Sequence, residues 1–346
     1  MCLSSAARGL SSVSKRGIVL IVCIWVLMAL SLLAAGFAYR VRLNYRATSY
    51  QAKEQELRYL ARGAVTEGIL VLEADNNEFD AFTESWDVPL RGVADDWLED
   101  TSLQCCRHPT VHCSVIDEER KVNVNTAGAD VLTALGIDAD VVSAILDWRD
   151  TNDEVTWPGG AESDYYLRRE QPYRCKNKPF ELLQELLLVK GVSRELFRGE
   201  DTNGNGKLDE GEDLNGDGEM QLGLCELLTV HGDGLVNLNT ASADVLASAS
   251  GMSDESARAF AAYRNGNDGE VGTDDDVVFG SLDDLKGVPS LSEFDYLRLL
   301  EVCKVASEYF SIHSTASEEG TLQQVQVEAT VRRAAEGVTV LSWEER

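Results

Sequence analysis

The stretch Ile18–Tyr39, IVLIVCIWVLMALSLLAAGFAY, decides the fold of the N-terminal part of this chain. It contains no charged residue, and as an α-helix it would extend about 33 Å, enough to cross the hydrocarbon core of a membrane. No proline occurs before Pro89, and the near-helical spacing of small and apolar residues continues beyond the span. The pattern therefore predicts a transmembrane helix over 18–39 that continues to about Leu72.

The residues before the span indicate how the chain is processed. A cleaved secretory signal has a shorter apolar stretch followed by small residues, which Ala34-Ala35-Gly36 imitates. Here the leader ends instead in Lys15-Arg16-Gly17, and the apolar run begins at once with Ile18. This arrangement resembles a prepilin peptidase site, where the cut precedes the apolar segment and the helix is retained. We therefore expect cleavage between Gly17 and Ile18.

Charge is distributed unevenly along the 346 residues, which carry a net charge of −28. Residues 1–62 have a net charge of +7, and the remainder has a net charge of −35. A region this acidic repels phosphate backbones, which argues against nucleic acid as a partner and suits cation binding.

Two stretches of the polar part share one pattern. Residues 122–132 read VNVNTAGADVL, and residues 236–246 read VNLNTASADVL. Each passes from alternating, strand-like residues into a predicted helix, and Thr126 and Thr240 are placed to act as N-caps. The repeat predicts two related helical units, at 126–232 and at 235–304.

The plan of these units resembles paired helix-hairpin-helix or SAM-like modules, and Asn-x-Asn-Thr-Ala also opens the DNA-binding modules of competence proteins. Such modules bind phosphate through backbone N–H groups at Gly-rich hairpins backed by Lys or Arg. The corresponding hairpins here, 136–140 and 251–255, place carboxylates where phosphate would sit. This disfavours DNA binding, although a membrane-anchored DNA receptor remains an alternative.

A more specific resemblance, covering most of the chain, is to the minor pseudopilin K family of type II secretion. Besides the leader site and the two Asn-x-Asn-Thr-Ala units, the matching motifs are Asp147–Asp150, Gly159–Tyr166, Pro172–Arg174 and Lys178–Phe180. Val22 agrees with this resemblance. Most pilins and pseudopilins carry Glu at the fifth mature position, and the K pseudopilin lacks it.

The fold that the resemblance implies is α+β and pilin-like: a long N-terminal helix packed on an antiparallel sheet, with a large all-helical insertion of two SAM-like/helix-hairpin-helix units. Alternating residues independently predict three C-terminal strands at 309–316, 322–332 and 338–343, and an earlier strand near 111–124. The expected divisions are a leader at 1–17, a membrane helix at 18–39, the two parts of a pilin domain at 40–125 and 305–346, and helical units at 126–232 and 235–304.

The implied function is that of a minor pseudopilin at the tip of the pseudopilus. It would be matured by prepilin peptidase and would nucleate assembly with other minor pseudopilins and the major pseudopilin, for export across the outer membrane. It would cross the inner membrane once, with its bulk in the periplasm. A wide insertion would clash with a subunit stacked above it. A minor pilin of a type IV pilus is an alternative, and no catalytic residue or enzymatic activity is expected.

A predicted calcium loop lies in the first unit. Residues 201–212 read DTNGNGKLDEGE and fit the pattern D-x-[DN]-x-[DN]-G-x5-E, whose spacing brings oxygen atoms around one ion. The predicted ligands are Asp201, Asn203, Asn205, Lys207, Asp209 and Glu212. A second loop offers Asp213, Asn215, Asp217 and Glu219. It has Leu224 where the closing Glu belongs, so a second ion is left open.

Six of the eight cysteines lie in the polar part: Cys105, Cys106, Cys113, Cys175, Cys225 and Cys303. An even number in an exported chain fits up to three disulfides, but the sequence does not decide their pairing. A zinc site around residues 105–113 is less favoured because the spacing of its cysteines and histidines is compressed.

Overall fold

The computed structural model describes residues 13–87, 109–200, 208, 211–213, 216, 218, 220–289, 291–318 and 323–346, with side chains from Ile18 onward. The chain divides into two compact units, residues 1–59 and residues 60–346. Helix α1 is continuous from Val13 to Ala74. The prediction of one long N-terminal helix ending near Leu72 is therefore confirmed, with the end two residues later.

The N-terminal part of α1 is apolar on all sides. From Ile18 onward, this is the one helix of the described chain that is long and apolar enough to cross a membrane. Its most apolar window has a mean hydropathy of 3.0, and none of that window is buried. Large side chains such as Val22 and Trp25 are more than half exposed. A helix that exposes apolar side chains around its whole circumference fits a single-pass membrane anchor.

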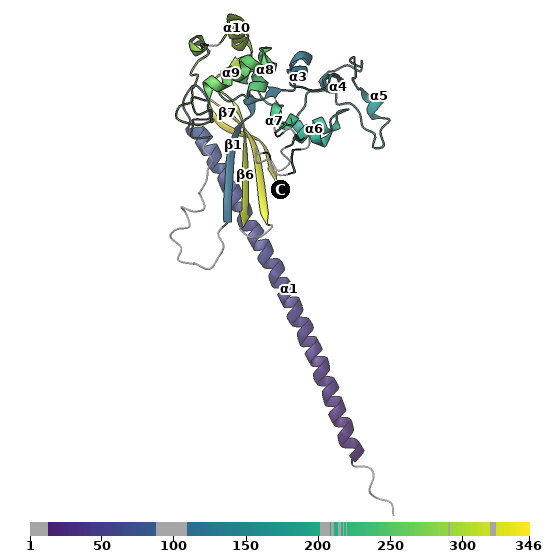
Figure 1. Cartoon of the computed structure of the whole chain (residues 1–346). Helices are drawn as coiled ribbons and strands as arrows, with labels where there is room; N and C mark the ends of the chain where they lie inside the picture. Colours follow the sequence, from purple (N-terminus) through teal and green to yellow (C-terminus); the bar gives the residue numbers. More distant parts are fainter. Residues whose placement is uncertain are drawn as a thin grey trace, which may run out of the picture. The chain divides into compact units, whose positions relative to one another are not determined.

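A four-stranded antiparallel sheet has the order β1-β6-β7-β8 (Figure 1). Its strands are β1 (Pro109–Asp117), β6 (Tyr309–Glu318), β7 (Gln324–Ala334) and β8 (Gly337–Glu345). The three predicted C-terminal strands are thus confirmed. The prediction for the earlier strand extended too far. β1 ends at Asp117, whose side chain accepts a hydrogen bond from Glu119 N and starts the 3-10 helix η1 (Glu118–Arg120).

The last turns of α1 pack against this sheet. Along β1, buried residues alternate with exposed ones, and Val111, Cys113 and Val115 belong to the buried set. Gly68 of α1 lies so close to the sheet that an added Cβ would be 3.1 Å from Ile312 Cγ2 and 3.4 Å from Val115 Cγ2. A side chain at this position would push the helix away from the sheet.

This contact generates a prediction for a matched pair of substitutions. Gly68→Leu should lower the free energy of unfolding by about 1–3 kcal/mol, because the core beneath it has no room for a larger side chain. Gly63→Leu should raise it by up to about 1 kcal/mol, because leucine favours the helix and nothing lies within 4 Å of this position. Denaturant unfolding of both variants checks this. Equal effects of the two substitutions would contradict the packing.

The chain between β1 and β6 contains short helices joined by loops, in two groups (Figure 1). The first runs from β2 (Val122–Asn123) to β3 (Leu228–Thr229) through α3 (Ala129–Ala134), α4 (Ala139–Arg149), α5 (Ser163–Tyr166), η2 (Leu183–Leu188), α6 (Arg194–Arg198) and α7 (Leu224–Leu227). The second runs from β4 (Val236–Asn237) to β5 (Cys303–Lys304) through α8 (Ala243–Ser250), α9 (Asp254–Arg264), η3 (Leu282–Gly287) and α10 (Glu293–Val302). In both groups the first and last strands pair in parallel, so each group closes on itself.

Equivalent asparagines of the repeat make equivalent contacts. The side-chain amide of Asn125 donates to Phe180 O at 3.0 Å, and Phe180 N donates back to Asn125 Oδ1 at 2.7 Å. Asn239 exchanges the same two bonds with Phe279, at 3.0 and 2.9 Å. A backbone segment far away in the sequence thus pairs with an amide side chain, because an amide offers both a donor and an acceptor.

The helix after each motif begins later than the repeat predicted. The N-caps are Gly128 for α3 and Ser242 for α8, not Thr126 and Thr240. Both threonines lie in the preceding turn, where their hydroxyls donate elsewhere: Thr126 to Asn123 O, and Thr240 to a carboxylate of the sheet. The N-cap assignment was therefore wrong, because these hydroxyls serve the turn and the tertiary structure.

Candidate functional site: a carboxylate joint between sheet and helices

Three consecutive acidic residues, Asp117, Glu118 and Glu119, lie at the end of β1 and the start of η1 and are buried, with exposed fractions of 1, 7 and 2%. Burying a carboxylate is costly unless hydrogen-bond donors or positive charges surround it. We call these three residues, together with Asn237 and Ser307, which bond to Asp117, and Asp80 and Arg333, which bond to Ser307, the joint. It lies where the chain leaves the sheet for the helical region and returns from it.

Asp117 attaches the second helical group to the sheet. Its Oδ2 accepts hydrogen bonds from Thr240 Oγ1 at 2.6 Å, Ser307 Oγ at 2.8 Å and Asn237 Nδ2 at 2.9 Å. Burial raises the pKa of Asp117, and these hydrogen bonds oppose the rise because they favour the ionised form. Two of the donors come from the second Asn-x-Asn-Thr-Ala motif, so this motif is a tertiary contact as well as a turn.

Glu118 and Glu119 are bonded to the closing strands of the two groups. Glu118 accepts from Thr229 Oγ1 of β3 at 2.7 Å and forms an ion pair with Lys121 at 3.3 Å. Glu119 forms an ion pair with Lys304 of β5 at 2.6 Å. Burial alone would raise the pKa of Glu118, but the charge of Lys121 and the hydrogen bond from Thr229 outweigh it and lower this pKa to about 2.

Arg333 of β7 connects the sheet to the segment that follows α1. Its Nη1 donates to Asp75 at 2.5 Å, and its Nη2 donates to Asp80 at 2.5 Å and to Ser307 O at 3.0 Å. Its guanidinium also lies over the ring of Phe310, 5.0 Å from the centroid. One side chain thus holds together the end of α1, the start of β6 and β7.

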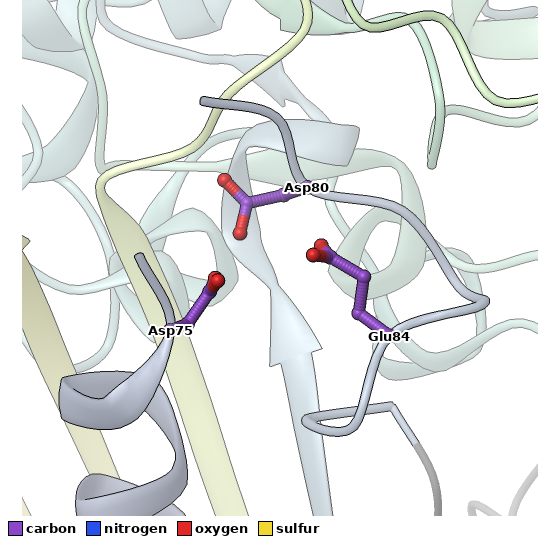
Figure 2. A group of neighbouring side chains, drawn as sticks. All are labelled: Asp75, Asp80 and Glu84. Carbon is purple, nitrogen blue, oxygen red and sulfur yellow. The ribbon is translucent and has the colours of Figure 1, made fainter. Parts of the chain in front are cut away.

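Figure 2 shows the carboxyl groups of Asp75, Asp80 and Glu84 facing one another, with oxygen atoms that lie within 4.8 Å. Asp80 is fully buried, and burial raises its pKa to about 7 although the charge of Arg333 opposes this. Its Oδ1 has no hydrogen-bond partner among the described residues. Glu84 accepts from Trp86 Nε1 at 3.0 Å and Ala81 N at 2.9 Å. Arg333 supplies a positive charge to this cluster through its ion pairs with Asp75 and Asp80.

The raised pKa of Asp80 generates a prediction about pH. A carboxyl group whose pKa is higher in the folded than in the unfolded state gives stability that is fully present below pH 3.8 and is lost as the pH rises through about 7. Asp80→Asn should abolish this part of the pH dependence. Urea unfolding at pH 4, 5.5 and 7 measures the free energy of unfolding of variant and parent. The value for Asp80→Asn should therefore rise relative to that of the parent as the pH rises.

The control for this experiment is Asp274→Asn, which removes an exposed carboxylate from the same chain. Its difference from the parent should be the same at the three pH values. If Asp80→Asn also followed the parent at a constant offset, Asp80 would not titrate between pH 4 and 7 in the folded protein.

The structure describes only part of the predicted calcium loops. Most of the predicted ligands lie outside the described residues: Asp201, Asn203, Asn205, Lys207, Asp209, Asn215, Asp217 and Glu219. Glu212 is buried, and the carboxylate of Asp213 accepts from Gly216 N at 2.6 Å and Gly218 N at 3.1 Å. The ends of the loop meet in a bridge between Gly199 and Leu222. Calcium binding by both loops stays a prediction.

The other predicted sites are placed as follows. Cys113, Cys175, Cys225 and Cys303 are free thiols in this structure, and Cys105 and Cys106 lie outside the described residues, so disulfide formation stays a prediction. The expected cleavage site between Gly17 and Ile18 lies within α1, which begins at Val13. Cleavage there also stays a prediction.

Sequence reasoning did not identify the joint. One signal was available, because Asp117-Glu118-Glu119 directly follows an alternating strand and precedes the first motif. Ser307, which bonds to Asp117, and Arg333, which bonds to Ser307, however, lie about two hundred residues away in the sequence, and only the fold brings them together.

Comparisons with known proteins agree with this architecture. Residues 115–199, which include the joint's three acidic residues and most of the first helical group, match the family model described as type II secretion system (T2SS), protein K. The type II secretion system protein K of Pectobacterium carotovorum subsp. carotovorum is 26% identical over 199 residues, and that of Klebsiella pneumoniae is 21% identical over 205 residues. Each alignment covers 53% of this chain and 60% of the relative.

A solved structure shares the fold. It is a chain from the crystal structure of the GspK–GspI–GspJ complex of the enterotoxigenic Escherichia coli type 2 secretion system, with a TM-score of 0.58 and 16% identity. The match covers 86% of this chain and 99% of that chain. The long helix, the antiparallel sheet and the matched segment together define the class: an α+β protein with an apolar N-terminal helix, similar in part of its sequence and in its fold to secretion-system components. Within that class, the resemblance to type II secretion system protein K is confirmed.

Proposed function

We propose that this chain is a minor pseudopilin of a type II secretion system. The observation that carries the proposal is the match to protein K over residues 115–199, because this segment runs from β1 through the joint into the helical region. The apolar N-terminal helix supports it, since a pseudopilin needs a membrane-held helix before assembly and a filament-forming helix afterwards. In this proposal the bulk of the chain lies in the periplasm.

We further propose that the subunit occupies the tip of the pseudopilus and nucleates its assembly. Ala64 of α1 accepts a hydrogen bond from Cys113 of β1. Farther along the chain, Asp75, the residue after α1, accepts one from Arg333 in the joint. The helical region is therefore attached at the end of the sheet nearest the C-terminus of α1. If subunits stack along their N-terminal helices, a region at this end would obstruct a subunit placed above.

Val22 supports the same position. In the proposed mature chain it is the fifth residue, where a Glu would pair with the N-terminal amine of a neighbouring subunit. A subunit at the tip has no neighbour above it and does not need this pair. The proposed partners are other minor pseudopilins and the major pseudopilin, and the solved relative belongs to a complex named GspK–GspI–GspJ. Calcium bound in the 201–219 loops would order a segment that is too polar to form a buried core.

Processing of the leader is the first prediction from this proposal. Co-expression with a prepilin peptidase should give a mature chain that starts at Ile18, seen as the loss of residues 1–17 by intact-mass measurement. Gly17→Leu should keep the leader attached, because a bulky residue then occupies the position before the cut. Gly36→Leu is the control and should be processed normally. A mature chain that starts beyond Gly36 would remove the membrane helix and overturn the proposal.

The partner proposal makes a separate prediction. The full chain, solubilised in detergent, should co-purify with the two other minor pseudopilins of its own secretion system and should leave them when the joint is broken by Arg333→Ala. Gly63→Ala, at an exposed position of α1, should retain both. Co-purification with type IV pilus subunits instead, or tight and salt-sensitive binding of DNA in a filter assay, would favour one of the alternatives over a secretion pseudopilin.

A further inference from the structure

Three arginines follow the apolar span of α1 at once: Arg40, Arg42 and Arg46. They are exposed on a continuous stretch of the helix (Figure 1), and Tyr39 and Tyr45, which are 66 and 74% exposed, lie among them. We call these five residues the basic collar. Because residues 18–39 contain no charged side chain, the basic collar is the place where α1 changes from apolar to strongly basic.

The arginines of the basic collar have no acidic partner within the described chain. No Asp or Glu occurs in the first 53 residues, so none lies one or two turns away on the helix. The next basic residues of α1 differ in this respect. Lys53 forms an ion pair with Glu56 at 3.2 Å. Arg58 forms one with Glu54 at 2.8 Å. The three charges nearest the span are therefore available to an anionic partner outside the chain.

The distance from the span places the basic collar at the depth of the lipid headgroups. A bilayer has a hydrocarbon core about 30 Å thick, with a polar layer of roughly 5–7 Å on each side. With Tyr39 at the edge of the core, Arg42 lies about 4–5 Å and Arg46 about 10 Å farther along the helix axis. Side chains of an α-helix lean toward its N-terminus, which here is the membrane side, so the long side chain of Arg46 can reach back into the polar layer.

The basic collar surrounds the helix instead of marking one face of it. At 3.6 residues per turn, the directions of Arg40 and Arg42 differ by about 160°, and Arg46 lies one turn beyond Arg42. The directions of Tyr39 and Tyr45 differ by about 120°. A protein that packs beside α1 would contact one face, whereas a bilayer encloses the helix on all sides. This distribution therefore favours lipid over a protein partner.

The chemistry of these side chains matches a phospholipid headgroup. A guanidinium group stays charged and donates two parallel hydrogen bonds to the oxygens of a phosphate. A tyrosine ring at this depth keeps its apolar body toward the acyl chains and its hydroxyl toward water. A headgroup with a net negative charge attracts the arginines more strongly than a zwitterionic one, whose ammonium group offsets its phosphate.

We propose that the basic collar binds the headgroups of anionic phospholipids, in the leaflet where the span of α1 ends. The bound lipids fix the depth of the helix in the membrane. This binding requires only that α1 crosses a bilayer, whichever assembly the chain serves. In the proposed pseudopilin, the leaflet is the one that faces the periplasm.

Processing of the leader would make the basic collar more important. Lys15 and Arg16 lie on the other side of the span, and the proposed cleavage after Gly17 removes both. The mature chain would then have no charged side chain before the span. Of the charged side chains that adjoin the span, those of the basic collar would alone remain to hold the helix at its depth.

The test measures the lipid selectivity of the full chain in phosphatidylcholine vesicles. A small amount of spin-labelled phosphatidylglycerol or spin-labelled phosphatidylcholine is added, and electron spin resonance gives the fraction of each label immobilised by the protein. The parent should prefer phosphatidylglycerol at least about twofold, because each Arg near the surface attracts anionic lipid. Arg42→Gln/Arg46→Gln should lose more than half of this preference. High salt should weaken the preference of the parent, because salt screens exposed charges.

The matched control is Lys53→Gln/Arg58→Gln. It also removes two positive charges from α1, but from positions about 20 Å or more beyond the span along the helix axis. Both of these charges are already paired with glutamates. The control should keep the lipid preference of the parent. An equal loss in the two double variants would show a general effect of charge and would contradict binding at the basic collar.

Flotation of the vesicles separates lost lipid selectivity from a lost anchor. The parent and both double variants should float with phosphatidylcholine vesicles, because their apolar span is unchanged. A parent chain that does not float lacks a membrane anchor, which would overturn both the basic collar and the pseudopilin proposal. A parent that floats without a lipid preference would overturn the basic collar alone. The same holds if Arg42→Gln/Arg46→Gln keeps its lipid preference but no longer co-purifies with the other minor pseudopilins, since these arginines then contact protein.

Discussion

The burial of three consecutive carboxylates at the end of β1 is the constraint on which the rest of this structure depends. Each of Asp117, Glu118 and Glu119 must be surrounded by donors, because a buried carboxylate without partners would cost more than a typical hydrogen bond contributes. Asp117 uses hydroxyl and amide donors, whereas the other two use lysines. Apart from Lys121, these donors belong to elements that are distant in the sequence, so the sheet and both helical groups complete one another's hydrogen bonds.

The repeat shows how one motif serves two different purposes. Asn123, in the first copy, donates to the carbonyls of His231 and Gly232, in the chain that leads from the first group to the second. Asn237, in the second copy, donates instead to Asp117, to Ser307 and to Asp80 O. The second group therefore binds the sheet directly. The first is held by the connection between the groups and by the bond from Thr229 to Glu118.

The elements that could be predicted from the sequence are those that depend on residues close together in the chain. The apolar run after Gly17, the alternation of the C-terminal strands and the repeated motif are local patterns, and each produced the expected element. The N-caps at Thr126 and Thr240 failed because a hydroxyl followed by a helix looks the same whether it caps the helix or bonds to a distant carboxylate. The joint could not be predicted, since Arg333 meets Asp75 only through the strand order of the sheet.

The two carboxylate clusters solve the same electrostatic problem by different means. In the joint, the positive charge is an arginine, which stays protonated at any pH at which the protein folds and cannot be removed by a chelator. In the first helical group, no Lys or Arg of the described residues forms an ion pair with the cluster of Asp147, Asp150 and Glu162. The connection between sheet and helices thus rests on a positive charge that the chain itself supplies.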